Sequence, residues 1–257
     1  GTLLEASGAD RDTWSAGLAT GGPLGGDGSA WRLAAQQFSS DGFQRNVYLG
    51  RDDTNGRDEA TVRGKLRWDL GAGWRADLAA LYVDLDNGFD AFAPDNSRHT
   101  RSDRPGRDAQ RTSGASANLR GTLGDLTLQS ISAYAQSDSV YSFDGDWGND
   151  AYWGEFAPYD YFSRYARERS TLSQDFRVES NPGGVIDWVA GLYALRLNED
   201  SQQRDEFAGE LLRPLLATSY AATSIAAYGE VEWPLSNQLS LTAGMRVESR
   251  SADYSDS

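Results

Sequence analysis

The strongest constraint on the fold of this chain is an alternation of apolar and polar residues, repeated in segments of about ten residues. Residues 59–70 show the pattern most clearly. One set of alternate positions is apolar and the other is charged: Ala60, Val62, Leu66, Trp68 and Leu70 stand against Arg63, Lys65, Arg67 and Asp69. Because successive side chains of a strand point to opposite sides of a sheet, such a segment has one apolar and one polar face. The polar face suits either the solvent around a soluble sheet or the polar interior of a membrane barrel.

The same alternation predicts an all-β protein with about eleven strands in an antiparallel up-and-down meander. We place the strands at about 2–8, 12–22, 29–40, 59–70, 74–84, 111–122, 126–138, 169–180, 185–198, 220–235 and 239–252. The connections alternate between two kinds. Tight turns are expected at 25–28, 71–73, 124–125, 181–184 and 236–238, and long loops at about 41–58, 85–110, 139–168 and 199–219. In a meander, alternate connections lie at opposite ends, so all short turns should share one end and all long loops the other.

This asymmetry is typical of outer-membrane β-barrels, which have short turns on one side of the membrane and long loops on the other. Apolar faces also carry tryptophans near the strand ends, where an aromatic girdle would meet the membrane interface: Trp68, Trp74, Trp188 and Trp233. A soluble propeller or sandwich would explain the alternation equally well, but it would explain the loops and the tryptophans less well. We therefore interpret the chain as a portion of a transmembrane β-barrel.

Composition excludes several other classes of protein. The chain has 257 residues, 39% of them hydrophobic, and it contains no apolar run long enough for a transmembrane helix. It has no cysteine and one histidine, His99, which leaves little for a thiolate or imidazole metal site or for a Ser-His-Asp triad. The net charge of −14 argues against nucleic-acid binding. No spacing of carboxylates singles out a general acid and a base, so we expect neither an enzyme nor a cofactor or metal site.

Four stretches of the sequence resemble one known family. Residues 21–35 followed by 40–43, and residues 46–53 followed by Val-Arg-Gly-Lys-Leu-Arg-Trp, resemble the early barrel of TonB-dependent outer-membrane receptors. Residues 169–180 ahead of 188–193, and residues 241–246, are similar to later parts of the same barrel. The order and spacing of these stretches extend the resemblance over nearly the whole chain.

The resemblance implies a receptor in the outer membrane of a Gram-negative bacterium that imports a scarce ligand, most often an iron–siderophore complex. Such receptors have a barrel of about 22 strands, filled by an N-terminal plug, and a short N-terminal box that binds TonB. Residues 1–257 would then be a partial barrel domain without plug or TonB box, cut from a longer polypeptide. Its partners would be outer-membrane lipid, TonB and a ferric siderophore. A passive porin-type channel is the alternative, and the upstream sequence would decide between the two.

The loop expected at 139–168 is the candidate ligand-binding site, because aromatic and acidic residues are crowded in it. Exposed aromatic side chains favour recognition, since they offer a large contact area and lose little rotamer entropy. Alternatively, the aromatic residues pack on each other and hold the loop over the barrel mouth. The candidates are Tyr141, Phe143, Asp144, Asp146, Trp147, Trp153, Tyr159 and Tyr161.

The loop expected at 85–110 adds Arg98 and Arg101 to the candidates, in a basic cluster that continues to Arg104 and Arg107. This cluster would steer an anionic ligand, bind lipopolysaccharide phosphates or pair with neighbouring aspartates. The acidic run at 144–150 allows calcium as a weaker alternative, although its spacing does not match an EF-hand.

Overall fold

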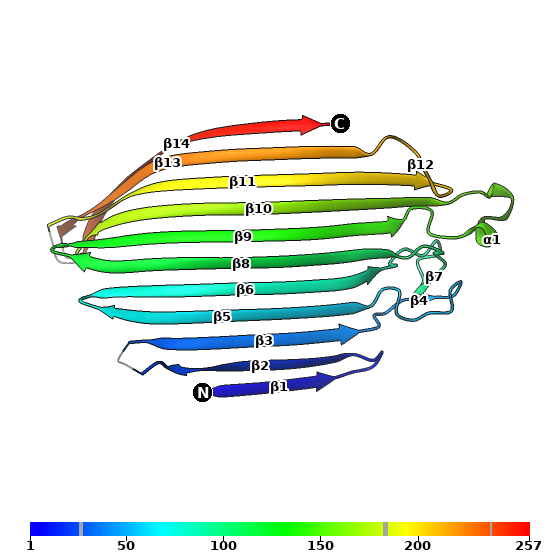
Figure 1. Cartoon of the computed structure of the whole chain (residues 1–257), viewed down its shortest axis with the longest axis horizontal. Coiled ribbons are helices and arrows are strands. Elements are labelled where there is room, and N and C mark those ends of the chain that lie inside the picture. The colour runs from blue at the N-terminus through cyan, green and yellow to red at the C-terminus, as the bar shows by residue number, and fades with distance from the viewer. Residues whose placement is uncertain (26–27, 182–184, 237) are drawn as a thin grey trace.

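The computed structural model describes residues 1–25, 28–181, 185–236 and 238–257. Eleven strands form one antiparallel sheet in which each strand pairs with its neighbours along the chain, so the topology is a simple meander (Figure 1). The strands are β1 (Thr2–Gly8), β2 (Trp14–Pro23), β3 (Ala30–Ser40), β5 (Arg57–Gly71), β6 (Trp74–Phe89), β8 (Gly106–Leu123), β9 (Leu126–Asp144), β10 (Tyr161–Ser180), β11 (Asp187–Phe207), β13 (Leu216–Ser236) and β14 (Leu239–Asp256). The predicted number, order and direction of the strands are therefore confirmed.

Several strands are longer than predicted at the end that carries the long loops. β10 begins at Tyr161 rather than near residue 169, and β11 ends at Phe207 rather than near residue 198. The ladder between them continues without interruption, for example where Arg164 lies opposite Arg204. In these extensions the outward face is polar as well, so the apolar–polar alternation stops although the backbone pairing does not. The loops are consequently shorter than predicted, at 41–56, 90–105, 145–160 and 208–215.

Five small elements lie in the long loops and were not predicted. They are β4 (Arg45–Asn46), β7 (His99–Thr100), β12 (Glu210–Leu211), the helix α1 (Asp150–Trp153) and a 3-10 turn (Gly154–Phe156). β4 and β7 pair in parallel, and β12 pairs with the end of β11. Each is only two to four residues long, which is too short for a periodic sequence signal.

The short turns and the long loops lie at opposite ends of the sheet, as predicted (Figure 1). The turn between β5 and β6 shows the turn chemistry: Gly71, Ala72 and Gly73 all have positive φ angles, of 76°, 52° and 78°. Glycine adopts such angles without steric cost, which allows a tight reversal. The predicted turns at 25–28, 181–184 and 236–238 include Gly26, Asp27, Pro182, Gly183, Gly184 and Asn237, which lie outside the described residues.

Cross-strand register places the apolar residues of neighbouring strands on one face of the sheet. Leu66 lies opposite both Trp31 and Leu78, and Ala80 lies opposite Ala115. We call this surface the apolar band; its exposed large side chains are Trp31, Leu33, Val62, Trp68, Leu70, Leu78, Tyr82, Leu119, Tyr134, Leu172, Phe176, Trp188, Leu192, Ile225, Val231, Trp233, Leu241, Met245 and Val247. Ala93, Ala222 and Ala226 are the only buried apolar residues in the described part of the chain. No second protein layer covers the band in these ranges, which argues against a sandwich.

Aromatic residues mark both limits of the apolar band. Trp68, Trp188 and Trp233 are exposed near the end with the short turns, as predicted for a girdle. Tyr82 and Tyr134 stand at the other limit, beyond which the same face becomes polar. Trp74 differs from the expectation. Its side chain is half-buried and lies over the backbone of Gly121, where an added Cβ would collide with the indole ring.

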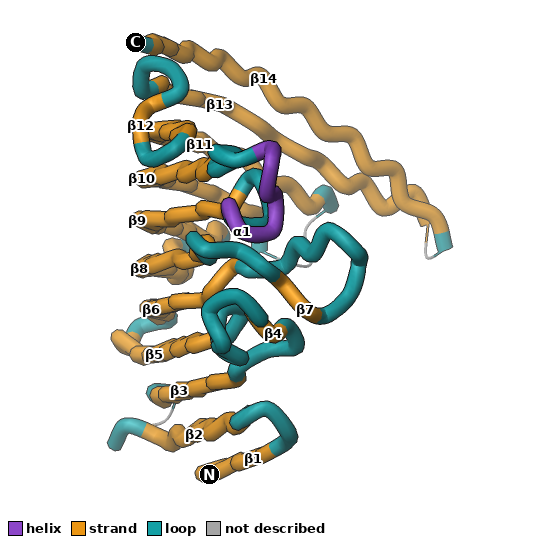
Figure 2. The backbone as a smooth tube through the Cα atoms, turned by 90° about the vertical axis from the view of Figure 1, so that its right-hand side faces the viewer, coloured by secondary structure: helices purple, strands orange, loops and turns teal. Residues whose placement is uncertain are grey.

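The opposite face of the sheet is polar and carries cross-strand ion pairs. Arg67 and Asp77 are 2.7 Å apart, as are Arg120 and Glu179. The sheet is curved and open: β13 and β14 swing toward the side on which the long loops lie (Figure 2). Within the described residues β1 and β14 each pair with one neighbour only, so the sheet does not close on itself. Among the same residues, no helix is both long and apolar enough to cross a membrane.

Candidate functional site

Three long loops are joined into one structure over the polar face, at the end of the strands. We call residues 41–56, 90–105 and 145–160 the loop cap; Figure 2 shows them on one side of the sheet. Asn46 is completely buried and its Nδ2 donates to Asp90 Oδ2 at 2.8 Å and to the Ser102 carbonyl at 2.7 Å. Asn149 Nδ2 donates to the Arg101 carbonyl at 2.7 Å. Side-chain amides therefore connect each loop to the next.

Tyr141 and Phe143 lie on the polar face at the end of β9, not in a loop as predicted. Their ring centroids are 5.7 Å apart, and Tyr141 also contacts Phe89 of β6 at 4.9 Å and Tyr165 of β10 at 6.4 Å. Both belong to the strand because β9 pairs with β10 up to Asp144. The aromatic residues thus come from three strands and form a wall beneath the loop cap.

Trp147 connects this wall to the loop cap. Its ring is stacked on Phe92 at 5.1 Å, and Phe92 in turn contacts Phe143 at 6.4 Å. Trp147 adopts a positive φ of 62° and remains 42% exposed. One face of the indole ring is therefore packed while much of the side chain faces solvent.

A second aromatic cluster lies within the loop at 145–160 and at the start of β10. Trp153 contacts Tyr159 edge to face at 5.0 Å, Tyr159 contacts Tyr161 at 5.2 Å, and Tyr161 contacts Phe207 of β11 at 4.8 Å. Tyr161 is the first residue of β10, so it is also outside the loop in which we expected it. These contacts favour the packing alternative for this cluster, in which the aromatic residues hold the loop in place.

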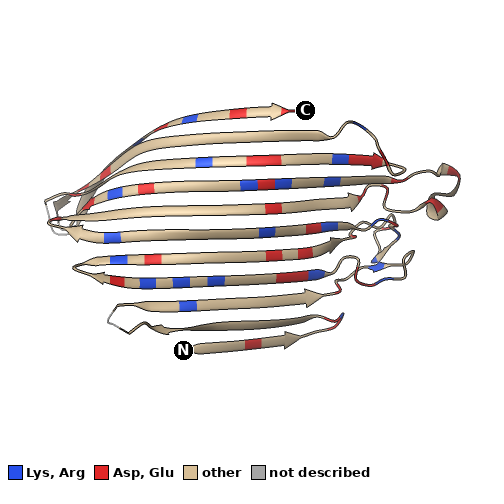
Figure 3. Ribbon diagram, viewed as in Figure 1, with Lys and Arg blue, Asp and Glu red and all other residues tan. Residues whose placement is uncertain are grey.

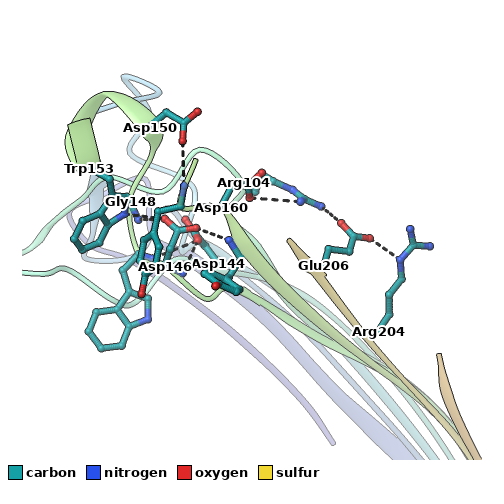
Figure 4. Close-up of polar contacts among 12 residues, drawn as sticks. Arg104, Asp144, Asp146, Gly148, Asp150, Trp153, Asp160, Arg204 and Glu206 are labelled. Atoms are coloured by element: carbon teal, nitrogen blue, oxygen red, sulfur yellow. Dashed lines mark hydrogen bonds and ion pairs between the residues drawn. The ribbon is translucent and has the colours of Figure 1, made fainter. Parts of the chain in front are cut away.

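Asp146 organises the turn of this loop. It accepts hydrogen bonds from the Gly148 amide at 3.0 Å, from Trp153 Nε1 at 3.1 Å and from the Tyr161 amide at 2.8 Å (Figure 4). With both oxygens engaged and the side chain buried, Asp146 is a structural anchor of the loop.

Asp144 is buried beside Asp146 but has fewer partners. One carboxylate oxygen accepts from the Asp146 and Trp147 amides, at 3.2 and 3.3 Å, while Oδ2 has no hydrogen-bond partner among the described residues. Burial, reinforced by the neighbouring Asp146 carboxylate, raises the pKa of Asp144 to about 8. The folded loop therefore favours the protonated form of Asp144 more than the unfolded chain does.

The basic cluster of the loop at 90–105 is dispersed. The Arg98 side chain is exposed and its carbonyl accepts from the Arg45 amide at 2.9 Å, while the Arg101 guanidinium lies over the Tyr152 ring at 5.2 Å. Arg104 binds Glu206 at 2.6 Å and lowers the pKa of that carboxyl (Figure 4). Arg107 binds Asp86 at 2.7 Å. Arg104 and Arg107 do pair with carboxylates, but those carboxylates are distant in sequence.

A hollow of about 460 Å³ opens on the polar face next to the aromatic wall. Its lining includes Tyr141, Phe143 and Tyr165, together with Arg167 and Gln203. Arg167 and Gln203 were missed as candidates, because only the register of β10 against β11 brings them together: Tyr165 lies opposite Gln203. Arg167 Nε is 3.4 Å from Glu199 Oε1. The hollow offers flat aromatic surface and hydrogen-bonding groups in one place.

The ten predicted site residues thus fall into separate groups. Tyr141 and Phe143 line the hollow, and Trp147 lies next to them through Phe92. The loop at 145–160 is stabilised by Trp153, Tyr159 and Tyr161 and by the carboxylates of Asp144 and Asp146. The two arginines, Arg98 and Arg101, lie in a different loop. In the described ranges, no group of three or more His, Cys, Asp or Glu side chains is placed to hold a metal ion.

The curved meander, the exposed apolar band and the polar face with loops gathered at one end define a class of fold, the wall of a large β-barrel of the outer-membrane type. No protein-family model and no curated protein matches the chain. Solved structures do match it, over nearly all of its length.

One match is the ferric yersiniabactin uptake receptor FyuA from Yersinia pestis, with a TM-score of 0.77 and 17% identity, covering 99% of this chain and 43% of that one. Another is the ferripyoverdine receptor of the outer membrane of Pseudomonas aeruginosa, with a TM-score of 0.68 and 16% identity over 98% of this chain and 37% of that one. A third is the ferric-catecholate import receptor Fiu from E. coli K12, with a TM-score of 0.66 and 14% identity over 99% and 41%. The chain spans less than half of each, and the likeness shows the fold.

Proposed function

We propose that this chain is part of the barrel domain of an outer-membrane receptor that takes up a scarce small ligand, an iron–siderophore complex being the expected one. The observation that carries the proposal is the exposed apolar band, which would be unstable in water and is suited to lipid. Along β5 the band runs over nine residues, from Val62 to Leu70. A tilted strand of an outer-membrane barrel needs about 9–11 residues to cross the hydrocarbon, so the length of the band fits.

The proposed site is the hollow beneath the loop cap. It lies on the polar face at the end with the long loops, where a ligand arriving from outside the cell would first meet the barrel. Tyr141 and Tyr165 would stack on the ligand, and Arg167 and Gln203 would contact its polar groups. The three solved receptors bind, according to their names, ferric yersiniabactin, ferripyoverdine and ferric catecholates, which makes an iron chelate the natural first ligand to test.

The open sheet implies that this chain does not transport by itself. A bilayer does not tolerate the unpaired edges of β1 and β14, so we propose that further strands close the barrel. A plug and a TonB box elsewhere in the polypeptide would couple it to TonB, as in the family that the sequence resembles. Reconstitution of residues 1–257 alone in liposomes with TonB should give no energy-dependent uptake, and uptake under those conditions would contradict this part of the proposal.

The function is tested by deleting the gene and supplying single ferric siderophores as the only iron source. We expect growth on at least one of them to be lost, and to be restored by the intact gene only when TonB is present. Uptake that continues without TonB would favour the passive porin alternative. Unchanged growth on every chelate would contradict the proposed ligand class.

The site is tested by comparing two tyrosines of β9 that face opposite sides. Tyr141→Ala removes an aromatic ring from the hollow, and affinity for the transported chelate should fall about tenfold, the equivalent of about 1.4 kcal/mol. Tyr134→Ala, on the apolar band, should leave affinity unchanged. If the two variants bind the chelate with equal affinity, Tyr141 does not belong to the binding site.

A further inference from the structure

One arginine lies on the apolar face of the sheet, at the edge of the apolar band. Arg196 of β11 is directly opposite Leu172 of β10, so the two side chains share this face, and the Arg196 side chain is exposed. Among the described residues, no carboxylate oxygen lies within 4.0 Å of its charged nitrogens; Nε is 3.5 Å from Asn198 Oδ1, a neutral acceptor. On β10 the first charged residue of this face, Glu168, comes four residues beyond Leu172. Arg196 is therefore an uncompensated cation close to the band.

A groove of about 700 Å³ crosses the apolar band and leads toward Arg196. Six residues that line it are cross-strand partners, each directly opposite the next: Leu33, Gly64, Ala80, Ala115, Tyr134 and Leu172. Arg196 is the next partner in the same row. The groove surface is almost wholly apolar, although Arg32, Lys65 and Ser116, whose side chains alternate to the polar face, also contribute to its lining. One row thus joins an apolar groove to an unpaired cation.

This row runs obliquely to the limits of the band. On β11 it reaches Arg196, the first charged residue of this face after Leu192 and Ala194. On β5 it reaches Gly64, which has Val62 of the band on one side and Leu66 on the other. Strands of outer-membrane barrels are tilted by about 35–45°, so a row perpendicular to them is tilted as well. A molecule along the row would pass from the edge of the band into its interior, as a lipid does with its headgroup at the interface and a chain in the hydrocarbon.

Three uncharged polar side chains interrupt the band beside the groove. Ser130 and Ser132 lie on the apolar face of β9, and Gln174 of β10 is directly opposite Ser132. Gln174 Nε2 donates to Ser130 Oγ at 3.0 Å, and Ser132 Oγ donates to Gln174 Oε1. No charged residue occurs on β9 between Leu126 and Ser137 (Figure 3). Hydrocarbon offers no hydrogen bonds, so polar groups here bind one another or a polar group of a lipid. A serine hydroxyl has one proton and two lone pairs, which leaves capacity for a further hydroxyl.

The depth of these polar side chains is shallow. Ser132 and Gln174 are two residues inside the band from Tyr134 and Leu172, which is about 6.6 Å along the strand and about 5 Å below the limit of the band after the tilt is included. Ser132 also lines the groove. The polar group is therefore placed to meet the part of an acyl chain that is nearest to its headgroup.

We propose that this groove binds a phosphorylated lipid whose acyl chains carry hydroxyl groups near the headgroup, the lipid A class of the outer leaflet. Arg196 binds a phosphate through its guanidinium, and the groove holds an acyl chain. Ser132 and Gln174 bind the hydroxyl on the third carbon of that chain. The long loops lie beyond this limit of the band, which places it in the outer leaflet. The inference rests on the proposed function in one respect, since it needs the apolar band to face an outer membrane.

Native mass spectrometry of the full-length protein in detergent, titrated with lipid A, tests the site. We expect saturable binding of lipid A and about tenfold weaker binding of two probes: lipid A without its phosphates, and phosphatidylglycerol, which has a phosphate but no hydroxylated chain. Arg196→Gln should weaken the binding of lipid A about tenfold and leave that of the phosphate-free form unchanged. Arg164→Gln is the matched control, because Arg164 is an exposed arginine of the same face, eight residues beyond Leu172, and it should bind lipid A as the original protein does.

The groove itself is tested by filling it. Ala115→Trp places a large ring in the groove and should weaken the binding of lipid A. Ala227→Trp adds the same ring to the apolar face of β13, opposite Leu192 and outside the groove, and should leave binding unchanged. Both rings would project toward lipid rather than into the protein, and equal unfolding temperatures of the two variants in detergent would show that the loss is one of binding.

Three results would overturn the proposal: no saturable binding of lipid A, equal binding by the original protein and by Arg196→Gln and Ala115→Trp, or binding of phosphatidylglycerol as tight as that of lipid A. Uptake assays keep this test separate from the proposed function. Because Arg196 lies on the outside of the barrel, Arg196→Gln should support chelate uptake as the original protein does. Binding of lipid A by a protein that supports no chelate uptake would leave the site standing and refute the proposed function instead.

Discussion

At the scale of single residues, two neighbouring carboxylates of the loop cap have opposite roles. Asp146 accepts three N–H donors with its two oxygens, whereas Asp144 has one oxygen without a partner among the described residues. Because the pKa of Asp144 is raised to about 8 in the folded cap, above the ordinary value of 3.8 for an aspartate, the cap binds this proton more tightly than the unfolded chain does. Its contribution to stability is therefore greatest at low pH and is lost as the pH rises from about 4 to about 8.

Substitution by asparagine should distinguish the two residues. Asp144→Asn keeps an oxygen for the two amides and removes the charge, so it should protect the cap above pH 8, as measured by hydrogen exchange of residues 145–160. Asp146→Asn turns an amide group toward an N–H donor and should weaken the same region by about 1–3 kcal/mol. A similar loss of protection in both variants would show that Asp144 is ionised in the cap.

Two glycines of β8 give a test of how closely the strands approach. A Cβ atom at Gly106 would overlap the Ser142 carbonyl oxygen, which is backbone and cannot swing away, whereas a Cβ at Gly114 would lie 3.4 Å from the Tyr134 carbonyl oxygen. Gly106→Ala should therefore lower the free energy of unfolding by about 1–3 kcal/mol. Gly114→Ala serves as the control and should change it little, and unfolding midpoints in urea measure both. If Gly106→Ala leaves the free energy of unfolding unchanged, β8 and β9 are further apart at this end than in the structure.

At the scale of the strands, the face of the sheet on which a side chain lies decides which substitutions it tolerates. Leu66 is on the apolar band and Lys65 is on the polar face of the same strand, β5. Leu66→Arg would place a charge in the hydrocarbon and should cost about 2–4 kcal/mol near the middle of the bilayer. Lys65→Arg should cost almost nothing. Folding titrations in lipid vesicles measure the difference, and equal costs would reverse our assignment of the two faces.

The difference between the two faces also explains which elements could be predicted from the sequence. Strands such as β5, β13 and β14 alternate over most of their length, because one face is apolar, and the sequence identifies them. The outer parts of β9, β10 and β11 carry polar residues on both faces, as around Asp138 and Asp200, so their pairing leaves no periodic signal. For that reason Tyr141, Phe143 and Tyr161 were placed in a loop although they belong to strands.

The site was predicted only in part, for a related reason. Crowded aromatic residues pointed to residues 139–168, and two of these candidates, Tyr141 and Phe143, line the proposed hollow. Arg167 and Gln203 carry no local signal, because they meet the aromatic wall through the register of β10 and β11. The contact of Asn46 with Asp90 likewise joins residues 44 positions apart that no short-range pattern connects.

At the scale of the whole molecule, the arrangement divides the sheet into two environments. The apolar band has no protein layer over it in the described ranges, and the polar face carries ion pairs, the aromatic wall and the loop cap. A lipid exterior and an aqueous interior account for both. They also account for the position of the loop cap, which lies beyond the limit of the band that Tyr82 and Tyr134 mark.

Spin labels at single cysteines along β5 of the full-length protein in bilayers test this division most directly, since the chain has no cysteine of its own. We expect labels at positions 62, 66 and 70 to be relaxed by oxygen dissolved in the lipid. Labels at positions 61, 63 and 65 should respond instead to a water-soluble nickel reagent. The absence of this two-residue alternation, or its reversal, would contradict the claim that the apolar band contacts lipid.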